Sequence, residues 1–472
     1  MKLVYALISL VSISDLGCAE TLHTTPPKPN IVIIVADDLG WKDVGYHGGS
    51  ARTPAIDRLV DEGVRLNRFY VAPLCSPTRA GLLTGRWPIR TGMAEAVITP
   101  WRKHAMPTTE HTIAELLAPA GYTRRAMIGK WHLGHYQRRF LPLNRGFTHF
   151  YGLYNGEFDY FTKKREGELD WHRGFETSRD EGYVTDLIGR EAVRFIASSN
   201  SQDPFFLYVA FTAPHTPLQA KPKDVTRYTS IENERKRVYA AMIDSMDQAI
   251  AKILDALDEQ GITNNTLVLF MSDNGGVQNL GNNTPWRGAK NTVYEGGIRV
   301  PAAIRWPEGG LSGGKQIDSV TGYIDIFPTL KRVAGIETPS PNPIDGGDML
   351  DVYRGDADPT RRLWFSYVAK GEPDNIALFD GRWKLVVTGG SVLSLSEDTK
   401  AIAPNIGAPH VELFDLTIDP REQNNIAPEH ANVVTRMLNQ LQKHRRLKPT
   451  GIPDFMQDRE GFKAPKDWLI TN

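Results

Sequence analysis

Cysteine is nearly absent from this chain. Among 472 residues there are two cysteines, Cys18 and Cys75. A framework of internal disulfides, of the kind that stabilises small secreted domains, is therefore excluded. If a cleaved leader removes Cys18, the mature protein holds a single thiol. Such a thiol is either a buried structural side chain or a group with a specific chemical task.

An excess of charge of either sign is also lacking. The chain has 55 basic and 55 acidic residues, so its formal net charge is zero. No global field would attract nucleic acid or an anionic membrane surface, and neither is an expected partner. Any attraction for an anion must come from a local group of side chains.

Long apolar runs are missing, apart from a short one at the N-terminus. Residues 1–13 combine one lysine with an apolar stretch too short to span a bilayer, which is typical of a signal peptide. Small residues predict cleavage after Ala19, which gives a secreted or periplasmic protein with a signal peptide at 1–19. A lipid anchor on Cys18 is less favoured, because Asp15 stands where lipoprotein signals carry an apolar residue. No later stretch predicts a membrane span.

The chain does contain an alternation of strand-like and helix-like segments. Apolar runs bounded by polar or glycine-rich clusters predict buried strands at 31–36, 123–128, 205–211 and 267–271. Helical spacing of apolar residues predicts helices at 112–117 and 237–257. Strands that alternate with helices indicate an α/β fold with a large, mainly parallel sheet covered by helices on both faces.

The pattern changes from residue 366 onward. Three short strand-like pieces occur at 376–379, 383–388 and 411–416. A helix with an apolar stripe follows at 434–441. Because the length also favours two unequal domains, we predict a catalytic domain at 28–365 and a smaller sheet-plus-helix domain at 366–472.

Polar side chains gather directly after the four predicted strands. They are Asp37 and Asp38, Lys130 and His132, His215, and Asp273 and Asn274. Ligands bind beyond the carboxyl ends of the strands in such sheets. Three carboxylates and one amide form a hard-oxygen set suited to Ca2+ or Mg2+, whereas zinc is less favoured because no two histidines have metal-ligand spacing. On an extended segment, Lys130 and His132 would point to the same side.

Cys75 begins the most informative segment. Ser76 is a favourable N-cap and Pro77 a favourable first helical residue, so we expect a helix from Pro77 to about Thr84. Cys75 would then lie just before the positive end of that helix, where an anion is stabilised. Arg79 would turn back towards the same anion as a planar clamp.

This segment resembles a motif of the sulfatase family, Cys-x-Pro-x-Arg followed by a helix with Leu-Leu-Thr-Gly. The stretch Gly-Lys-Trp-His-Leu-Gly at 129–134 is similar to a second family segment, and His215 and Lys290 match a further histidine and lysine. The resemblance runs from about Pro29 to Lys466. Within the family it is greatest to the arylsulfatase B, or N-acetylgalactosamine 4-sulfatase, group, although the paired cysteines of that group are lacking.

The resemblance implies an alkaline-phosphatase-like fold, with a smaller antiparallel domain, and hydrolysis of sulfate esters. Cys75 would be oxidised to formylglycine by a formylglycine-generating or sulfatase-maturing enzyme, and the hydrated aldehyde would be the nucleophile. The implied ligands of a Ca2+ cofactor are Asp37, Asp38, Cys75 as formylglycine, Asp273 and Asn274. The implied catalytic residues are Cys75, Arg79, Lys130, His132, His215 and Lys290. The expected substrate is a sulfated carbohydrate, with N-acetylgalactosamine or galactose sulfate first.

Each of these residues has an implied role. Arg79 and Lys130 stabilise the sulfate oxygens, His215 with Lys290 protonates the departing oxygen, and His132 takes a proton at residue 75. Two rival functions remain. A phosphatase, phosphodiesterase or phosphonate hydrolase of related fold is the first, but two-metal phosphatases need more ligands than the sequence offers. A non-enzymatic sugar-binding relative is the second, and it would have lost catalytic residues that are all present here.

Overall fold

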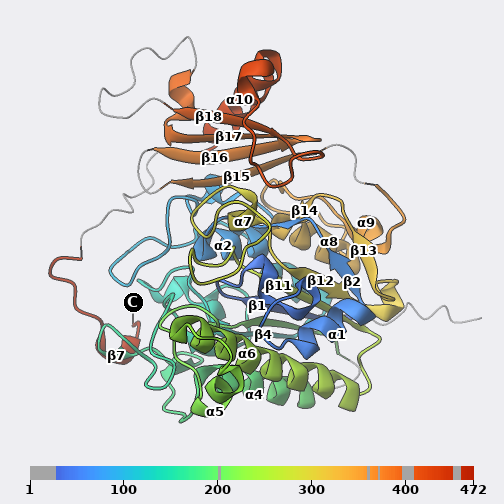
Figure 1. The fold of residues 1–472 in the computed structure, drawn as a ribbon. Coiled ribbons are helices and arrows are strands. Elements are labelled where there is room, and N and C mark those ends of the chain that lie inside the picture. Colours follow the sequence, from blue (N-terminus) through green and yellow to red (C-terminus); the bar gives the residue numbers. More distant parts are fainter. Residues whose placement is uncertain are drawn as a thin grey trace, which may run out of the picture.

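The computed structural model describes residues 28–199, 203–358, 362–369, 373–395, 409–449 and 459–471. Helices surround one large sheet, and a second, smaller sheet lies on the opposite side of the molecule from α4 (Val184–Ala197) and α6 (Glu234–Glu259) (Figure 1). The expected leader and Cys18 lie outside the described residues. Within the described ranges, no helix is both long and apolar enough to cross a membrane.

The large sheet has ten strands in the order β13-β2-β12-β11-β1-β10-β4-β5-β8-β9. Their bounds are β1 Asn30–Ala36, β2 Val64–Leu66, β4 Arg124–Lys130, β5 His149–Leu153, β8 His172–Arg173, β9 Glu176–Thr177, β10 Phe205–Ala210, β11 Thr266–Ser272, β12 Ala302–Arg305 and β13 Lys315–Ile317. The central strands from β11 to β5 run parallel, whereas β12 is antiparallel to both its neighbours. The four strands predicted from the sequence are the adjacent β11, β1, β10 and β4, so the mainly parallel sheet is confirmed.

Helices cover both faces of this sheet. Along β1, Ile33 and Val35 belong to one apolar core and Ile34 and Ala36 to the other, which is why the strand has a continuous apolar sequence. The apolar stripe predicted for α6 packs into the second core. The other helices are α1 Pro54–Glu62, α2 Cys75–Thr84, α3 Ile113–Leu117, α5 Pro222–Val225, α7 Glu295–Ile298, α8 Ile326–Val333, α9 Leu350–Arg354 and α10 Ala431–Arg445.

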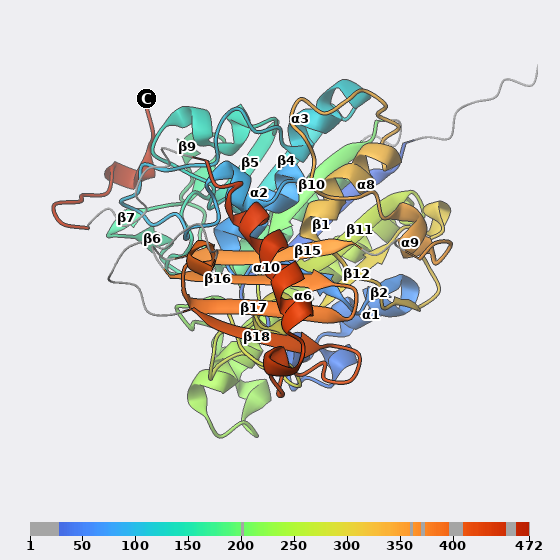
Figure 2. The ribbon, with the colours of Figure 1, turned by 90° about the horizontal axis from the view of Figure 1, so that it is seen from above.

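The smaller sheet has four antiparallel strands in the order β15-β16-β17-β18. Their bounds are β15 Leu363–Ala369, β16 Asp374–Asp380, β17 Trp383–Gly390 and β18 His410–Asp415. α10 crosses the outer face of this sheet (Figure 2), which confirms the predicted antiparallel sheet with a helix. Two short pairs complete the strands: β3 Phe69–Tyr70 with β14 Thr321–Gly322, and β6 Lys164–Arg165 with β7 Glu168–Leu169.

β15 was not predicted, and the expected domain boundary at 365/366 falls inside it. The small sheet therefore begins at Leu363. Trp364 on this strand packs against the rings of Trp87 and Tyr70, and residues of both sheets belong to one apolar core. The small sheet is thus attached to the large one through a shared core.

A buried lysine also links the small sheet to α7. Lys384 on β17 is fully buried, and its Nζ lies 3.0 Å from Glu295 Oε1 and 2.6 Å from Glu422 Oε1. Without this cation two buried carboxylates would face each other. We expect Lys384→Met to lower the free energy of unfolding by about 3–5 kcal/mol, measured by urea denaturation. The exposed Lys443 on α10 provides the control, and a Lys384→Met protein as stable as Lys443→Met would contradict this role.

Candidate active site

Cys75 is the first residue of α2 and does not precede the helix. The prediction that Ser76 caps a helix beginning at Pro77 is therefore wrong, whereas the predicted end is confirmed. The Ser76 hydroxyl cannot cap the helix because it serves tertiary structure. It donates to the carbonyl oxygen of His132 at 2.9 Å and accepts from the backbone N–H of Ile98 at 3.2 Å. Residue 75 still lies at the positive helix end, where an anion is stabilised.

Three cationic side chains hold three buried carboxylates at the carboxyl ends of the central strands. The pairs are Lys130 with Asp37 (Nζ to Oδ2, 2.6 Å), Arg79 with Asp273 (Nη2 to Oδ2, 2.8 Å) and Lys290 with Asp38 (Nζ to Oδ1, 2.6 Å). Asp38 also accepts a hydrogen bond from the amide of Asn274 at 2.8 Å. The structure thus brings together seven residues that the sequence placed at separate strand ends, helix starts and loops.

The carboxylate cluster fits a hard divalent cation. In the described part of the chain, Asp37 Oδ1 and Asn274 Oδ1 are buried and accept no hydrogen bond. One oxygen each of Asp37 and Asp273 and the Sγ of Cys75 lie within 4.8 Å of one another. Burial, together with the negative charge of Asp37, raises the pKa of the Asp273 carboxyl to about 7. A divalent cation would use the two orphan oxygens and offset the like charges.

His132 presents one ring nitrogen to residue 75. Its Nε2 lies 3.1 Å from the carbonyl oxygen of Ile98, which can only accept, so this nitrogen carries the proton. Its Nδ1 lies 3.3 Å from Cys75 Sγ. Burial, assisted by the positive charges of Lys130 and Arg79, lowers the pKa of His132 well below its usual value. The ring is therefore neutral, and Nδ1 can accept a proton from a group at residue 75.

Two residues of the site have a left-handed backbone conformation that favours glycine. Asp38 has φ 68° and His132 has φ 59°. The segment from Lys130 to His132 is consequently not extended, so the predicted reason for their shared direction is wrong although both side chains reach the site. Such conformations cost about 1–3 kcal/mol each and are concentrated at functional sites.

His215 follows β10 and faces two carboxylates. Its Nδ1 lies 2.7 Å from the carbonyl oxygen of Thr216 and therefore carries a proton. Its Nε2 lies 3.6 Å from Asp38 Oδ2, and its Nδ1 lies 3.6 Å from Glu157 Oε2. Burial lowers the pKa of His215, and the negative charge of Asp38 opposes this shift. Nε2 is the ring nitrogen that remains available to a substrate oxygen.

A cavity of 430 Å³ gives access to these groups, a volume within the roughly 300–1,000 Å³ of small-molecule pockets. Its wall contains Cys75 together with both histidines and Lys290. The rest of the wall comes mainly from two segments, within 96–102 and 156–165, the second of which ends in β6. The cavity therefore connects the candidate nucleophile with a binding space for a small substrate.

The sequence did not point to the second of these segments. Gly156 lies in it, and a Cβ at this position would lie 2.4 Å from ring atoms of His132, so the close approach of the ring requires glycine. Glu157, the neighbour of His215, was not predicted either. Both residues come soon after the end of β5, just as the predicted site residues follow their strands. This position after a strand is the feature by which the sequence could have indicated them.

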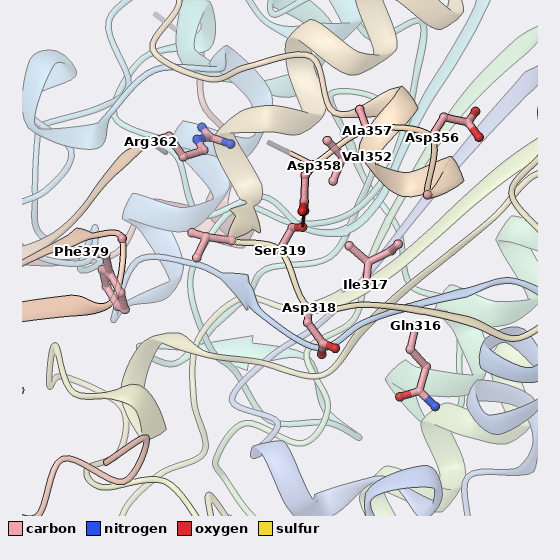
Figure 3. A pocket seen from close by; sticks show the side chains of 13 residues that line it. Gln316, Ile317, Asp318, Ser319, Val352, Asp356, Ala357, Asp358, Arg362 and Phe379 are labelled. Carbon is pink, nitrogen blue, oxygen red and sulfur yellow. Dashed lines mark hydrogen bonds between the residues drawn. The ribbon is translucent and has the colours of Figure 1, made fainter. Parts of the chain in front are cut away.

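A larger hollow of 750 Å³ lies elsewhere, beside β13 and α9 (Figure 3). Asp318, Asp356 and Asp358 line it, and its Arg362 is already paired with Asp325. Its described lining residues include no histidine, lysine or cysteine. The smaller cavity is therefore the candidate active site.

Similarity to known proteins defines the class of this enzyme. Residues 29–336 match the family model described as Sulfatase. The chain is 32% identical over 470 residues to N-acetylgalactosamine-6-sulfatase of Mus musculus, with 91% of this chain and 88% of that protein covered. The chain therefore belongs to the sulfatase family and is a sulfuric ester hydrolase.

Other similar proteins support the same class and the fold. Arylsulfatase J of Mus musculus is 32% identical over 468 residues, which cover 90% of this chain and 77% of that protein. The crystal structure of Ps i-CgsB in complex with k-i-k-neocarrahexaose has a TM-score of 0.80 at 30% identity, covering 89% of this chain and 94% of that one. The predicted alkaline-phosphatase-like fold is confirmed, whereas the finer resemblance to the 4-sulfatase group stays a prediction.

A more distant neighbour shares the fold alone. The phosphonate monoester hydrolase of Agrobacterium radiobacter has a TM-score of 0.62 at 19% identity, covering 89% of this chain and 96% of that one. The fold by itself therefore does not separate sulfate from phosphonate esters, and the choice between them depends on the site.

Proposed function

We propose that this sulfatase hydrolyses the sulfate ester of a carbohydrate with a formylglycine made from Cys75 and a Ca2+ ion held by Asp37, Asp38, Asp273 and Asn274. The observation that carries the proposal is the position of Cys75. It starts a helix, lies 3.3 Å from His132 Nδ1 and borders the carboxylate cluster. The relative named N-acetylgalactosamine-6-sulfatase and the neocarrahexaose complex support a sugar as the substrate.

The formylglycine and the metal ion would supply the central chemistry. A hydrated formylglycine offers one hydroxyl to attack sulfur and a second to expel sulfate, and Ca2+ offers positive charge to the sulfate oxygens. Side chains of the protein would supply the other charges and the proton transfers. Arg79 and Lys130 orient the carboxylates and add positive charge around an anionic ester. His132 Nδ1 accepts a proton at residue 75. His215, once it is doubly protonated beside Asp38 and Glu157, donates the proton on Nε2 to the departing oxygen, with Lys290 nearby.

His215 should matter most for poor leaving groups. We expect His215→Asn to lower kcat by roughly 10²–10⁴-fold on a sugar sulfate, because the departing alkoxide needs a proton. The loss should be much smaller on 4-nitrophenyl sulfate, whose phenolate leaves without one. Steady-state kinetics on both esters measures this difference, with the exposed His410→Asn as the control. Equal losses on both esters would rule out proton donation by His215.

The rival function, that of a phosphatase or phosphonate hydrolase, is tested on matched esters. Purified, matured enzyme is assayed with 4-nitrophenyl sulfate, 4-nitrophenyl phosphate and 4-nitrophenyl phenylphosphonate. We expect a higher kcat/KM on the sulfate than on the phosphate, because the three cationic side chains of the site are already paired with carboxylates and the second negative charge of the phosphate has no further cation to balance it. The phenylphosphonate carries one negative charge, as the sulfate does, so it compares phosphorus with sulfur at equal charge. A higher kcat/KM on either phosphorus ester would support the rival.

Export is part of the proposal. Residues 1–19 would be removed as a signal peptide, and the mature enzyme would be secreted or periplasmic. Cys75 is 1% exposed in the folded chain, so a formylglycine-generating or sulfatase-maturing enzyme has to act before folding is complete. N-terminal sequencing of the exported protein checks the cleavage site.

A further inference from the structure

We infer that Tyr160 is a positioning residue for the proposed proton donor, because its hydroxyl holds the turn that carries His215. The inference rests on the proposed function, in which His215 protonates the departing oxygen. The Tyr160 hydroxyl lies 2.6 Å from the carbonyl oxygen of Thr212 and 2.8 Å from that of His215, and it shares its proton between them. The backbone N–H of His215 donates to the same Thr212 carbonyl at 2.9 Å, which closes a four-residue turn soon after β10. One side chain thus contacts both ends of this turn.

The His215 end of the turn depends on Tyr160. Among the described residues, the carbonyl oxygen of His215 accepts a hydrogen bond from the Tyr160 hydroxyl and from no other group. The middle of the turn is anchored separately, since the carbonyl oxygen of Ala213 accepts from the backbone N–H of Asp37 at 3.0 Å. Loss of the hydroxyl should therefore shift His215 and leave Asp37, with the proposed metal position, in place.

Tyr160 is itself fixed in place. It is 1% exposed, and its ring stacks on that of Tyr183 with the ring centroids 5.6 Å apart. The backbone N–H of Tyr160 donates to Oε1 of Gln219 at 2.8 Å, and Nε2 of Gln219 donates to Oδ2 of Asp159 at 2.6 Å. The stretch of chain that begins at His215 is therefore bonded to Tyr160 a second time, four residues further on. The hydroxyl consequently acts on the turn from a fixed position.

The position of the His215 imidazole follows that of the turn. Its Nδ1 bonds to the carbonyl oxygen of Thr216, the next residue, which moves with the turn. The carboxylates of Asp38 and Glu157 each lie 3.6 Å from a ring nitrogen, beyond hydrogen-bond distance. A proton donor has to come within about 2.6–3.2 Å of the oxygen that it protonates, and a misplacement of about 1 Å can cost a hundredfold in rate. The Tyr160 hydroxyl should thus affect proton transfer to the departing oxygen and leave the attack on sulfur unchanged.

The test measures steady-state kinetics of the whole, matured enzyme on 4-nitrophenyl sulfate and on the best substrate among the 4- and 6-sulfates of N-acetylgalactosamine and galactose. The variants are Tyr160→Phe, His215→Asn and the double variant. Tyr122→Phe is the matched control. Its buried hydroxyl also donates to a backbone carbonyl, that of Pro29 at 2.8 Å, but at the amino ends of β1 and β4, on the opposite edge of the sheet from the site. Both tyrosine variants lose one such bond, so their melting temperatures should fall by similar amounts.

We expect Tyr160→Phe to lower kcat on the sugar sulfate about ten- to a hundredfold and to change kcat on the nitrophenyl ester much less. Tyr122→Phe should leave both values unchanged. In the His215→Asn background, loss of the Tyr160 hydroxyl should bring no further decrease on the sugar sulfate, because the group that it positions is absent. Equal losses of Tyr160→Phe on both esters, or losses that multiply in the double variant, would overturn the inference. Equal losses of the single variant His215→Asn on both esters would instead overturn the proposed role of His215 itself.

Discussion

Cys75→Ser should stop multiple turnover while the protein stays folded. A serine offers one hydroxyl, so a sulfate ester formed on it has no second hydroxyl to expel the sulfate, and the enzyme stalls. His132 Nδ1, which lies 3.3 Å from the side chain of residue 75, could still take the first proton. We expect the steady-state kcat to fall by roughly 10⁴–10⁶-fold, as for the loss of other covalent nucleophiles. A stopped-flow trace should show at most one equivalent of nitrophenol per enzyme.

The control for this variant is its stability. Serine has nearly the shape of cysteine, and among the described residues the thiol has one hydrogen-bond partner, His132, so the melting temperature should change little. A folded Cys75→Ser protein with sustained turnover at the wild-type rate would contradict the role of residue 75.

Removal of the proposed divalent cation should have the second large effect, on both stability and activity. Without the cation, the negative charges of Asp37, Asp38 and Asp273 repel one another in a buried site. Saturating Ca2+ at about a hundred times its Kd would add roughly 2.7 kcal/mol to the free energy of unfolding, which calorimetry detects as a higher melting temperature. Chelation should abolish both this shift and the turnover, and Ca2+ should restore both.

Variants distinguish a bound metal from a general salt effect. Asp37→Asn should lose the Ca2+-dependent rise in melting temperature together with activity. The substitution replaces a negatively charged ligand, whose Oδ1 is buried without a hydrogen bond, by a neutral amide that binds Ca2+ less tightly. Asp356→Asn, an exposed change at the edge of the larger hollow, should retain both. An enzyme shown to be free of metal that kept full activity would contradict the assignment of Ca2+.

The centre of the fold was predictable because its strands are buried on both faces. β1, β10 and β11 have continuous apolar sequences, and burial on two sides explains this pattern. The outer strands β8 and β9 are two residues long, too short to show any periodicity. They form because β8 pairs with β5 and β9 pairs with β8, and this pairing between distant segments cannot be read from the local sequence.

The candidate site was predictable where residues follow a strand or form a dense motif. The predicted start of α2 was wrong because the Ser76 hydroxyl can either cap a helix or bond to distant backbone groups. In the structure it bonds to His132 and Ile98, so it does not take the capping role that local sequence preference favours. Arg165 and Trp468 could not be predicted as partners, since they are 303 residues apart in the sequence. The residues around Cys75 could therefore be predicted from the sequence, and the contact between Arg165 at the edge of the cavity and the C-terminal segment could not.

The most direct measurement is the mass of the tryptic peptide Phe69–Arg79 taken from protein of known specific activity. We expect active enzyme to carry an aldehyde in place of the Cys75 thiol, so that the peptide has a correspondingly lower mass and the modified fraction rises with activity. Fully active protein whose peptide retains an unmodified thiol would contradict it.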